Sequence, residues 1–444
     1  MKITTERTRE RKYKFYIYCT RFSLARGAIM KNTKKLLATA VILTFALLLG
    51  CGGNYPAPPT DSGANIDTIG NGNGEMALLP ENDTTTAQTP PFHVPQEFVR
   101  GVWVTTAWQL DFPARVGMTA DELQASINEM ADNMLRWETT DIFFQVRSMG
   151  DAFYPSEIFP WAASLSGTQG VAPDGEFDVL RAWIDAAHAR GMRLHAWVNP
   201  YRLGAPGANP RSANLLTYQF PHLIVEHANA LYFCPGNPES LEIVLAGIEE
   251  LARNYNLDGI HFDDRFYPSA NFNDSASFAE FGGDMTLEDW RRENVNSLVR
   301  QTQAIAHAHG MIFGVSPFAI WQNSATDPRG SATNGAQSYH LMFADTLRWV
   351  ENGYVDYIAP QIYWHQGHPL ACFDAVFDWW LDVTADTGVM LYIGIAAYRQ
   401  FEPSRFPYWQ IGDTLNWQEY VTRNTDGVDG VIFFRYVSMH EWLG

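Results

Sequence analysis

The stretch Arg193-Leu194-His195-Ala196-Trp197-Val198-Asn199-Pro200-Tyr201-Arg202 reads as a buried strand that ends in polar residues. Aliphatic and small residues occupy every second position, which predicts that this face packs against helices. The opposite face carries His195, Trp197 and Asn199. A strand with one apolar face and one polar, aromatic face is typical of a closed barrel whose lumen contains ligand-binding side chains as well as core residues.

Similar runs recur along the chain, each followed by polar residues. The eight predicted strands are Phe98 to Thr106, Asp141 to Ser148, Arg193 to Arg202, Gly259 to Phe266, Met311 to Phe318, Val355 to Trp364, Leu391 to Arg399 and Gly430 to Val437. Between them, Ala120 to Leu135, Phe177 to Arg190 and Leu241 to Asn254 show the spacing of apolar residues typical of amphipathic helices. This alternation predicts an α/β fold, a (β/α)8 TIM barrel over residues 97–444.

The amino-terminal segment has the pattern of a signal peptide, which we predict over residues 1–50. Met30 opens a basic stretch, and the apolar run Leu36 to Leu49 then leads to Gly50-Cys51. We place the true start at Met30; a long basic leader that begins at Met1 is the alternative. Leu48-Leu49-Gly50-Cys51 resembles a bacterial lipobox, which predicts lipidation of Cys51.

Residues 51–96 are rich in Pro, Gly, Asn, Asp and Thr, which predicts a flexible linker. Together with the lipidated cysteine, this linker predicts a domain held at a membrane in the cell envelope, facing outside the cytoplasm. Beyond the anchor only Cys234 and Cys372 remain. A disulfide between them and two separate thiols are both compatible with the sequence.

Charge and composition exclude several classes of protein. The formal net charge is −18, and 11 of the 31 basic residues lie in the first 50 positions, so the remainder is strongly acidic and nucleic acid is disfavoured as a partner. No lysine follows Lys35, which excludes a Schiff-base or Walker-type lysine in the folded domain. No dinucleotide fingerprint or Gly-x-Ser-x-Gly elbow occurs, and nothing implies a cofactor or a protein partner.

Polar and aromatic residues converge at the predicted carboxyl ends of the strands, where barrel enzymes place their sites. Flat aromatic faces can stack on sugar rings while amides and guanidinium groups bond hydroxyls. We therefore predict a carbohydrate site. The predicted substrate-binding residues are Trp103, Gln145, Arg147, His195, Trp197, Asn199, Tyr201, Arg202, His261, Ser316, Gln361, Tyr363, Trp364 and Tyr398.

Asp263-Asp264 is the only carboxylate pair at a predicted strand end. Glycosidic cleavage commonly uses two carboxyl groups, so we predict both as catalytic residues. The second carboxylate is open, because loop or helix residues could also reach the site. These further candidates are Asp151, Glu157, Asp289 and Asp345.

A zinc site formed by His195, His261 and Asp263 is an alternative interpretation of these lumen-facing residues. No His-x-His strand or His-Glu-x-x-His helix accompanies these residues, so we predict no metal.

Several motifs resemble the family 10 glycosyl-hydrolase-like proteins. They include Arg100-Gly101-Val102-Trp103, Phe144-Gln145-Val146-Arg147, Leu194 to Arg202, Asp258 to Asp264, Gly314 to Trp321 and Asp356 to Trp364. The resemblance covers nearly all of Phe98 to Tyr436 and implies a glycoside-hydrolase-like barrel that acts on cell-wall glycan. The expected function is therefore hydrolysis of an envelope polysaccharide, with peptidoglycan glycan strands as the first choice; a lipid-anchored glycan-binding protein without activity is the alternative.

The chain departs from the family pattern at Arg265, where a tyrosine usually follows the Asp pair. A guanidinium beside two carboxylates is expected to lower the pKa of both. On that basis the pair suits a nucleophile or charge stabiliser better than an acid.

Overall fold

The computed structural model describes residues 97–206, 216–410 and 413–444. All of these lie in one compact unit, Ala87–Gly444. The predicted signal peptide, the lipidated Cys51 and the linker lie outside the described residues. No helix among the described residues is long and apolar enough to cross a membrane.

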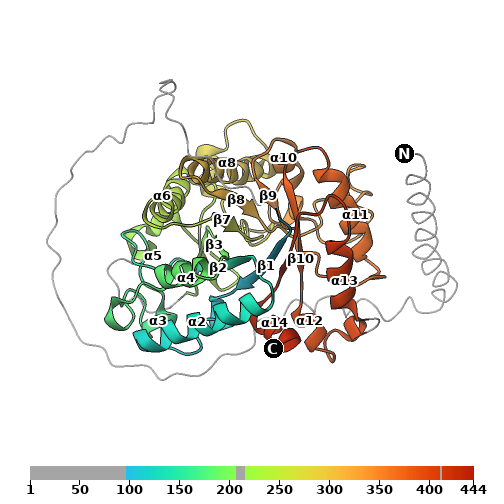
Figure 1. The fold of residues 1–444 in the computed structure, drawn as a ribbon. Helices are drawn as coiled ribbons and strands as arrows, with labels where there is room; N and C mark the ends of the chain where they lie inside the picture. The colour runs from blue at the N-terminus through green and yellow to red at the C-terminus, as the bar shows by residue number, and fades with distance from the viewer. Residues whose placement is uncertain (1–96, 207–215, 411–412) are drawn as a thin grey trace, which may run out of the picture. The chain divides into compact units, whose positions relative to one another are not determined.

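Eight parallel strands close into a barrel, which confirms the predicted fold class (Figure 1). In barrel order they are β1 (Val99–Val104), β2 (Asp141–Arg147), β3 (Arg193–Val198), β7 (Gly259–Phe262), β8 (Ile312–Val315), β9 (Tyr357–Ile358), β10 (Met390–Ile395) and β11 (Gly430–Phe433). Closure occurs between β1 and β11, where Val99 pairs with Gly430 and Val102 with Phe433.

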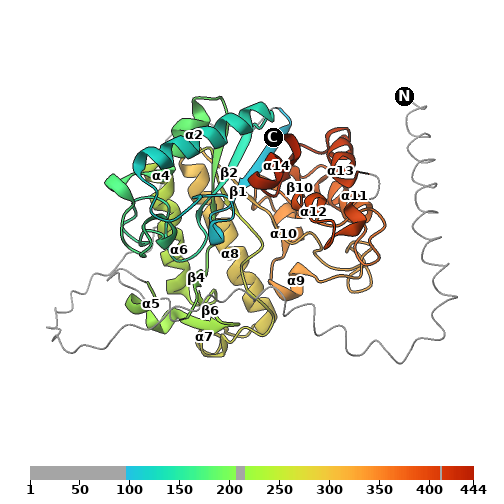
Figure 2. The ribbon, with the colours of Figure 1, turned by 90° about the horizontal axis from the view of Figure 1, so that it is seen from below.

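Helices follow each strand and surround the barrel, as Figures 1 and 2 show. Each strand is followed by one main helix. In chain order these helices are α2 (Ala120–Arg136), α4 (Val179–His188), α6 (Pro238–Asn254), α8 (Leu287–Ala308), α10 (Thr346–Glu351), α11 (Phe373–Thr384), α13 (Thr414–Arg423) and α14 (Tyr436–Leu443). Helix α2 begins with a capping box, in which Thr119 and Glu122 each accept a bond from the other's backbone N–H. Helix α6 begins three residues earlier than predicted because Asn237 caps it and Pro238 occupies its first turn.

Shorter elements occupy the loops. They are η2 (Ala107–Gln109), α3 (Ala163–Ser166), η3 (Asp174–Glu176), α5 (Leu216–Gln219), η4 (Pro221–Leu223), α7 (Ser275–Phe281), α9 (Ser338–Leu341), α12 (Tyr398–Phe401) and η5 (Pro407–Gln410). The predicted third strand does not run to Arg202. It ends at Val198, and Arg202 begins a separate antiparallel sheet of β4 (Arg202–Gly204), β6 (Ala230–Phe233) and β5 (Ile224–His227).

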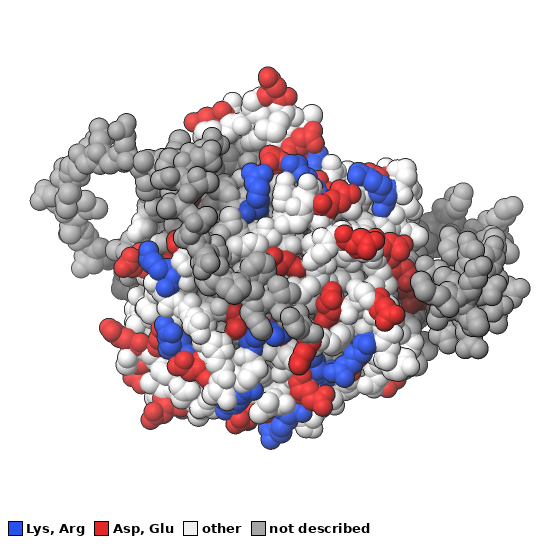
Figure 3. Space-filling model, turned by 45° about the horizontal axis from the view of Figure 1, so that its top comes forward, with Lys and Arg blue, Asp and Glu red and all other residues white. Residues whose placement is uncertain are grey.

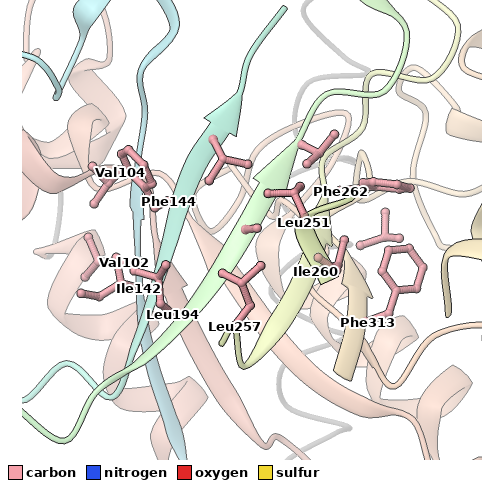
Figure 4. Packing of buried hydrophobic residues seen from close by; sticks show 14 of the residues in the cluster. Val102, Val104, Ile142, Phe144, Leu194, Leu251, Leu257, Ile260, Phe262 and Phe313 are labelled. Atoms are coloured by element: carbon pink, nitrogen blue, oxygen red, sulfur yellow. The ribbon is translucent and has the colours of Figure 1, made fainter. Parts of the chain in front are cut away.

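The core has two layers separated by the barrel wall. Outward-facing strand residues belong to the larger cluster, which also contains buried residues of the helices. Figure 4 shows Ile142, Leu194 and Ile260 among them. A smaller inner cluster fills the lumen and contains Trp103, Phe143, Trp197, Tyr357, Tyr392 and Ile432 among others. The prediction that Leu194, Ala196 and Val198 face the helices is confirmed, since all three belong to the outer cluster.

Candidate active site

A chain of side-chain hydrogen bonds crosses the carboxyl ends of three neighbouring strands. Gln145 at the end of β2 donates from Nε2 to Asn199 Oδ1 over 2.7 Å. Asn199, which follows β3, donates from Nδ2 to Asp263 Oδ2 over 2.6 Å. Because Asp263 directly follows β7, the chain ends at the carboxylate that the sequence places at the fourth strand. The structure thus brings together three predicted site residues.

The orientation of the Gln145 amide is determined by the residues after β1. Its Oε1 accepts bonds from Thr105 Oγ1 at 2.8 Å, Thr106 N at 3.0 Å and Ala107 N at 2.9 Å. Three donors at one oxygen leave Nε2 as the group that must donate to Asn199. Sequence reasoning missed Thr105 and Thr106; their place directly after the first strand was the available signal.

Asp263 is held in a nearly dry environment. The residue is 9% exposed, and its Oδ1 accepts a bond from Arg265 N over 3.0 Å. Burial raises the pKa of Asp263 to about 6, with a further rise caused by the negative charge of Asp264. Arg265 and Asn199 oppose this rise but do not cancel it. The expectation that Arg265 would give Asp263 a low pKa is therefore wrong, because the cost of burying the charge is larger.

Asp264 is buried beside the same loop, and its Oδ1 lies 3.3 Å from Arg265 Nε. The Arg265 side chain itself is 61% exposed. Tyr363 lies within electrostatic reach of both carboxylates: burial is the main cause of its raised pKa, and Tyr398, Asp264 and Asp263 add to it. The two aspartates thus share one site but have different immediate partners.

His261 forms the floor beneath this site. It is fully buried, and its Nε2 accepts from Trp103 Nε1 over 3.1 Å and lies 3.1 Å from Ser316 Oγ. Its Nδ1 lies 3.0 Å from the hydroxyl of Tyr357, so the ring proton belongs on Nδ1. Burial, followed by the nearby His195, lowers the pKa of His261 well below its usual value. The structure therefore places His261, Trp103 and Ser316 in a neutral supporting layer.

His195 and Tyr201, two of the predicted substrate contacts, lie away from the carboxylates. His195 faces the lumen but lies lower, where its Nε2 is 2.8 Å from Asp141 Oδ1 at the start of β2. Alternation predicted correctly that His195 faces the lumen. It could not predict how deep in the barrel the side chain lies. Asn199, four residues further along the chain, is the residue that reaches the carboxylates. Tyr201 is fully buried in the outer cluster. Burial raises the pKa of Tyr201, and the nearby Cys234 raises it further.

Strand alternation predicts that Arg147 faces the lumen, as Gln145 does two residues earlier, but the structure places it on the helix side. A register irregularity between Gln145 and Arg147 interrupts the pairing of β2 with β3. The extra residue of such a bulge changes the side to which the next side chain points. The Arg147 guanidinium consequently lies 3.8 Å from the centroid of the Phe159 ring, against Gly247 of α6.

Further aromatic residues gather at the barrel mouth, in the segments that follow β9, β10 and β11. Tyr363 and Tyr398 both contact Phe434, with ring centroids 6.0 and 6.1 Å apart, and Trp364 packs edge-on against Phe318. Gln361 does not reach the carboxylates and donates instead to the Ser316 carbonyl over 2.8 Å.

On the side of β3, the Nε1 atom of Trp197 has no hydrogen-bond partner among the described residues. Arg202 lies against the exposed ring of Trp108, with its guanidinium carbon 4.8 Å from the ring centroid.

Three of the other carboxylate candidates have side-chain partners elsewhere, and Glu157 is bound through its backbone. Asp151 accepts from Gln169, Asp289 pairs with Arg292, and Asp345 accepts from Trp321. The backbone N–H of Glu157 donates to Glu250. None of these bonds joins the network of Asp263, so Asp264 is the carboxylate that the structure keeps beside it.

The remaining alternatives from the sequence concern metal and cysteine. Among the described residues, no group of three or more His, Cys, Asp or Glu side chains is arranged to hold a metal ion. Cys234 Sγ donates to Ser277 Oγ over 3.3 Å, and Cys372 Sγ lies 3.7 Å from Asp374 Oδ2. The two cysteines are therefore separate thiols in this structure.

Comparison with known proteins agrees with the strand-end motifs. The chain is 37% identical to glycosyl hydrolase YngK of Bacillus subtilis (strain 168) over 319 residues, which cover 69% of this chain and 62% of that protein. It is 36% identical to glycosyl hydrolase DigH of Escherichia coli (strain K12) over 364 residues, or 76% of this chain and 82% of that protein. The chain thus spans less than two thirds of YngK and most of DigH.

Among solved structures, the PgaB (BpsB) glycoside hydrolase domain from Bordetella bronchiseptica is 13% identical with a TM-score of 0.49, covering 77% of this chain and 96% of that domain. Residues 98–410 match the family described as Glycosyl hydrolase-like 10. The chain belongs to this family, which confirms the resemblance that its strand-end motifs predicted.

Proposed function

We propose that the protein is a glycoside hydrolase that cleaves an envelope polysaccharide, with peptidoglycan glycan strands as its substrate, and that Asp263 is its general acid. The observation that carries this proposal is the raised pKa of Asp263, about 6, at a buried strand end. A carboxyl group with a pKa of about 6 is half protonated at that pH, and the protonated form can donate to a glycosidic oxygen as the bond breaks. The curated relatives YngK and DigH are named glycosyl hydrolases, which supports the reaction class.

Asp264 supplies the second carboxylate in this proposal. Cleavage passes through a transition state with positive charge at the sugar ring, which a nearby carboxylate stabilises. The negative charge of Asp264 also raises the pKa of Asp263, so one aspartate helps the other to keep its proton. Water then adds to the sugar, and its proton restores the carboxyl group of Asp263. The pair divides the work of acid and stabiliser between two adjacent residues.

The surroundings of the pair suit a sugar. Asn199 and Gln145 hold Asp263 in place, while Tyr363, Tyr398 and Trp364 offer aromatic surface at the barrel mouth. For the location, we propose attachment to a membrane through Cys51 with the barrel outside the cytoplasm, as the lipobox resemblance and the linker composition indicate. An enzyme tethered in this way would meet envelope glycans directly.

The test is incubation of the full chain, purified in detergent, with peptidoglycan glycan strands with and without stem peptides. Released sugars are followed by mass spectrometry for wild type, Asp263→Asn and Asp264→Asn. Asp185→Asn, on the exposed face of α4, is the matched control and should retain full activity. We expect release by wild type and a loss of at least a hundredfold in both site variants.

Binding of strands without release from wild type would contradict the hydrolase proposal. That result would indicate the alternative function, a lipid-anchored glycan-binding protein. Release that survives in Asp263→Asn would instead remove Asp263 from the role of acid.

A further inference from the structure

We propose that Trp108 and Arg202 form a subsite for an acidic sugar, a pyranose that carries a carboxylate, next to the Asp263 pair. This inference rests on the proposed function and specifies the substrate class of the same site. Trp108 would stack on the ring, and the guanidinium of Arg202 would bind the carboxylate. Arg202 was predicted as a substrate contact, whereas its pairing with Trp108 and the charge of the ligand follow only from the structure.

Trp108 is held where packing alone does not explain it. The residue is 68% exposed, although large aromatic side chains usually bury most of their surface. Its backbone has φ 51°, in the left-handed region that is unfavourable for a non-glycine residue. The loop before it is bound to the site, because Ala107 N donates to Gln145 Oε1 and Thr106 Oγ1 to the Gln145 carbonyl. An exposed indole anchored in this way to the catalytic network suits a platform for a sugar ring.

Among the described residues, Arg202 is a cation without an acidic partner, although the chain is rich in acids. Among the ion pairs of the described residues none involves Arg202, and its buried Nε has no hydrogen-bond partner there. Burial is the main cause of the lowered pKa of Arg202, and Arg265 adds to it. A buried donor without an acceptor is destabilising, and more so when the group is charged. A carboxylate satisfies a guanidinium better than a neutral hydroxyl does, because it accepts two charge-assisted bonds in the plane of the group.

Position and charge connect this pair to the reacting centre. Arg202 follows Asn199 by three residues, and Asp263 and Arg265 both act on its pKa, so the guanidinium lies within electrostatic reach of the carboxylates. The chain as a whole carries a formal charge of −18, and acidic side chains are spread over the face shown in Figure 3. An acidic polysaccharide would be repelled by such a surface unless cations received it locally. Arg202 and Arg265 supply that local positive charge.

The experiment measures binding, so that it does not depend on turnover. The full chain carrying Asp263→Asn is titrated with glycan strands freed of stem peptides, in which each muramic acid bears an ionised carboxylate. The second ligand is the same strands with those carboxylates reduced to alcohols. We expect the native strands to bind at least tenfold more tightly than the reduced ones. Adding Arg202→Gln should remove this preference. Adding Trp108→Ala should weaken the binding of both ligands by the same factor.

Arg181→Gln in the same background is the matched control, because Arg181 of α4 also lies over an aromatic ring, 4.9 Å from that of Tyr255, which directly follows α6. It should leave both affinities unchanged. Arg202→Lys, which keeps the charge but not the planar fork, should retain part of the preference and guards against a variant that fails to fold. Equal affinity of the parent chain for the two ligands, or no binding of either, would overturn the subsite. Preferential binding together with no cleavage by wild type would overturn only the hydrolase proposal.

Discussion

The Nδ2 atom of Asn199 lies 2.6 Å from Oδ2 of Asp263, and Gln145 leaves the Asn199 amide no other productive orientation. This bond favours the ionised form of Asp263 and opposes the effect of burial on its pKa. It also holds the carboxyl group in one rotamer. The behaviour of the proposed acid therefore depends on a residue that never needs to touch the scissile bond.

Replacement of Asn199 by alanine should raise the pKa of Asp263 further, because a donor to the carboxylate is lost. The alkaline limb of the pH–rate profile should move to higher pH, while kcat falls about tenfold or more through lost positioning. The measurement is kcat/KM against pH for wild type and variant. Asn128→Ala on α2 is the control and should change neither; an unshifted alkaline limb in Asn199→Ala would contradict the role of Asp263 as acid.

Replacement of Gln145 by leucine should destabilise the fold as well as the site. It leaves the N–H groups of Thr106 and Ala107 and the hydroxyl of Thr105 without their shared acceptor. We expect a loss of about 2–4 kcal/mol in the free energy of unfolding, measured by urea denaturation, since each unsatisfied buried donor costs about 1–3 kcal/mol. Wild-type stability in this variant would show that water replaces the amide.

Asp263→Asn should stabilise the protein at neutral pH. The folded-state pKa of Asp263 is raised from its usual 3.8 to about 6, so the folded state binds the proton more tightly than the unfolded chain does. This group therefore lowers stability as pH rises from about 4 to 6. The variant should gain on the order of 1–3 kcal/mol at pH 7 and almost nothing at pH 4. Urea denaturation at the two pH values checks this, and a variant destabilised equally at both would contradict it.

His307 on α8 should make stability fall as pH rises above about 6.5. Its hydrogen bond to Asp356 raises the pKa of His307, although partial burial lowers it. The stabilisation is complete below the usual pKa of about 6.5 and is lost as pH rises through the raised value. In His307→Gln the fall in melting temperature between pH 6 and pH 8 should be smaller than in wild type. Equal slopes would show that the ion pair contributes nothing.

Gly247→Ala tests the outward position of Arg147. Alanine usually stabilises a helix interior relative to glycine by about 1 kcal/mol. A Cβ at Gly247, however, would lie 2.4 Å from Phe159 Cε2 and 2.6 Å from Arg147 Nη1. We therefore expect a loss of about 1–3 kcal/mol from overpacking. A stabilised variant would show that Arg147 and Phe159 lie elsewhere.

Much of the architecture could be predicted from local patterns. Alternation identified the face of every residue discussed on β3 and β7, because a strand has a period of two whatever its neighbours are. The same rule failed at Arg147, where the pairing of β2 with β3 is irregular. It also could not tell that His195 binds Asp141 at the start of β2, far below Asn199.

The sequence by itself determined the barrel, its strand order along the chain and the Asp263-Asp264 pair at the fourth strand end, since periodicity and short motifs are local properties. Only the tertiary structure decided which groups meet these carboxylates. Gln145 and Asn199 are 54 residues apart, and Asn199 and Asp263 are 64 apart. Their bonds exist because parallel strands end at one edge of the barrel, and the raised pKa of Asp263 exists because that edge excludes water.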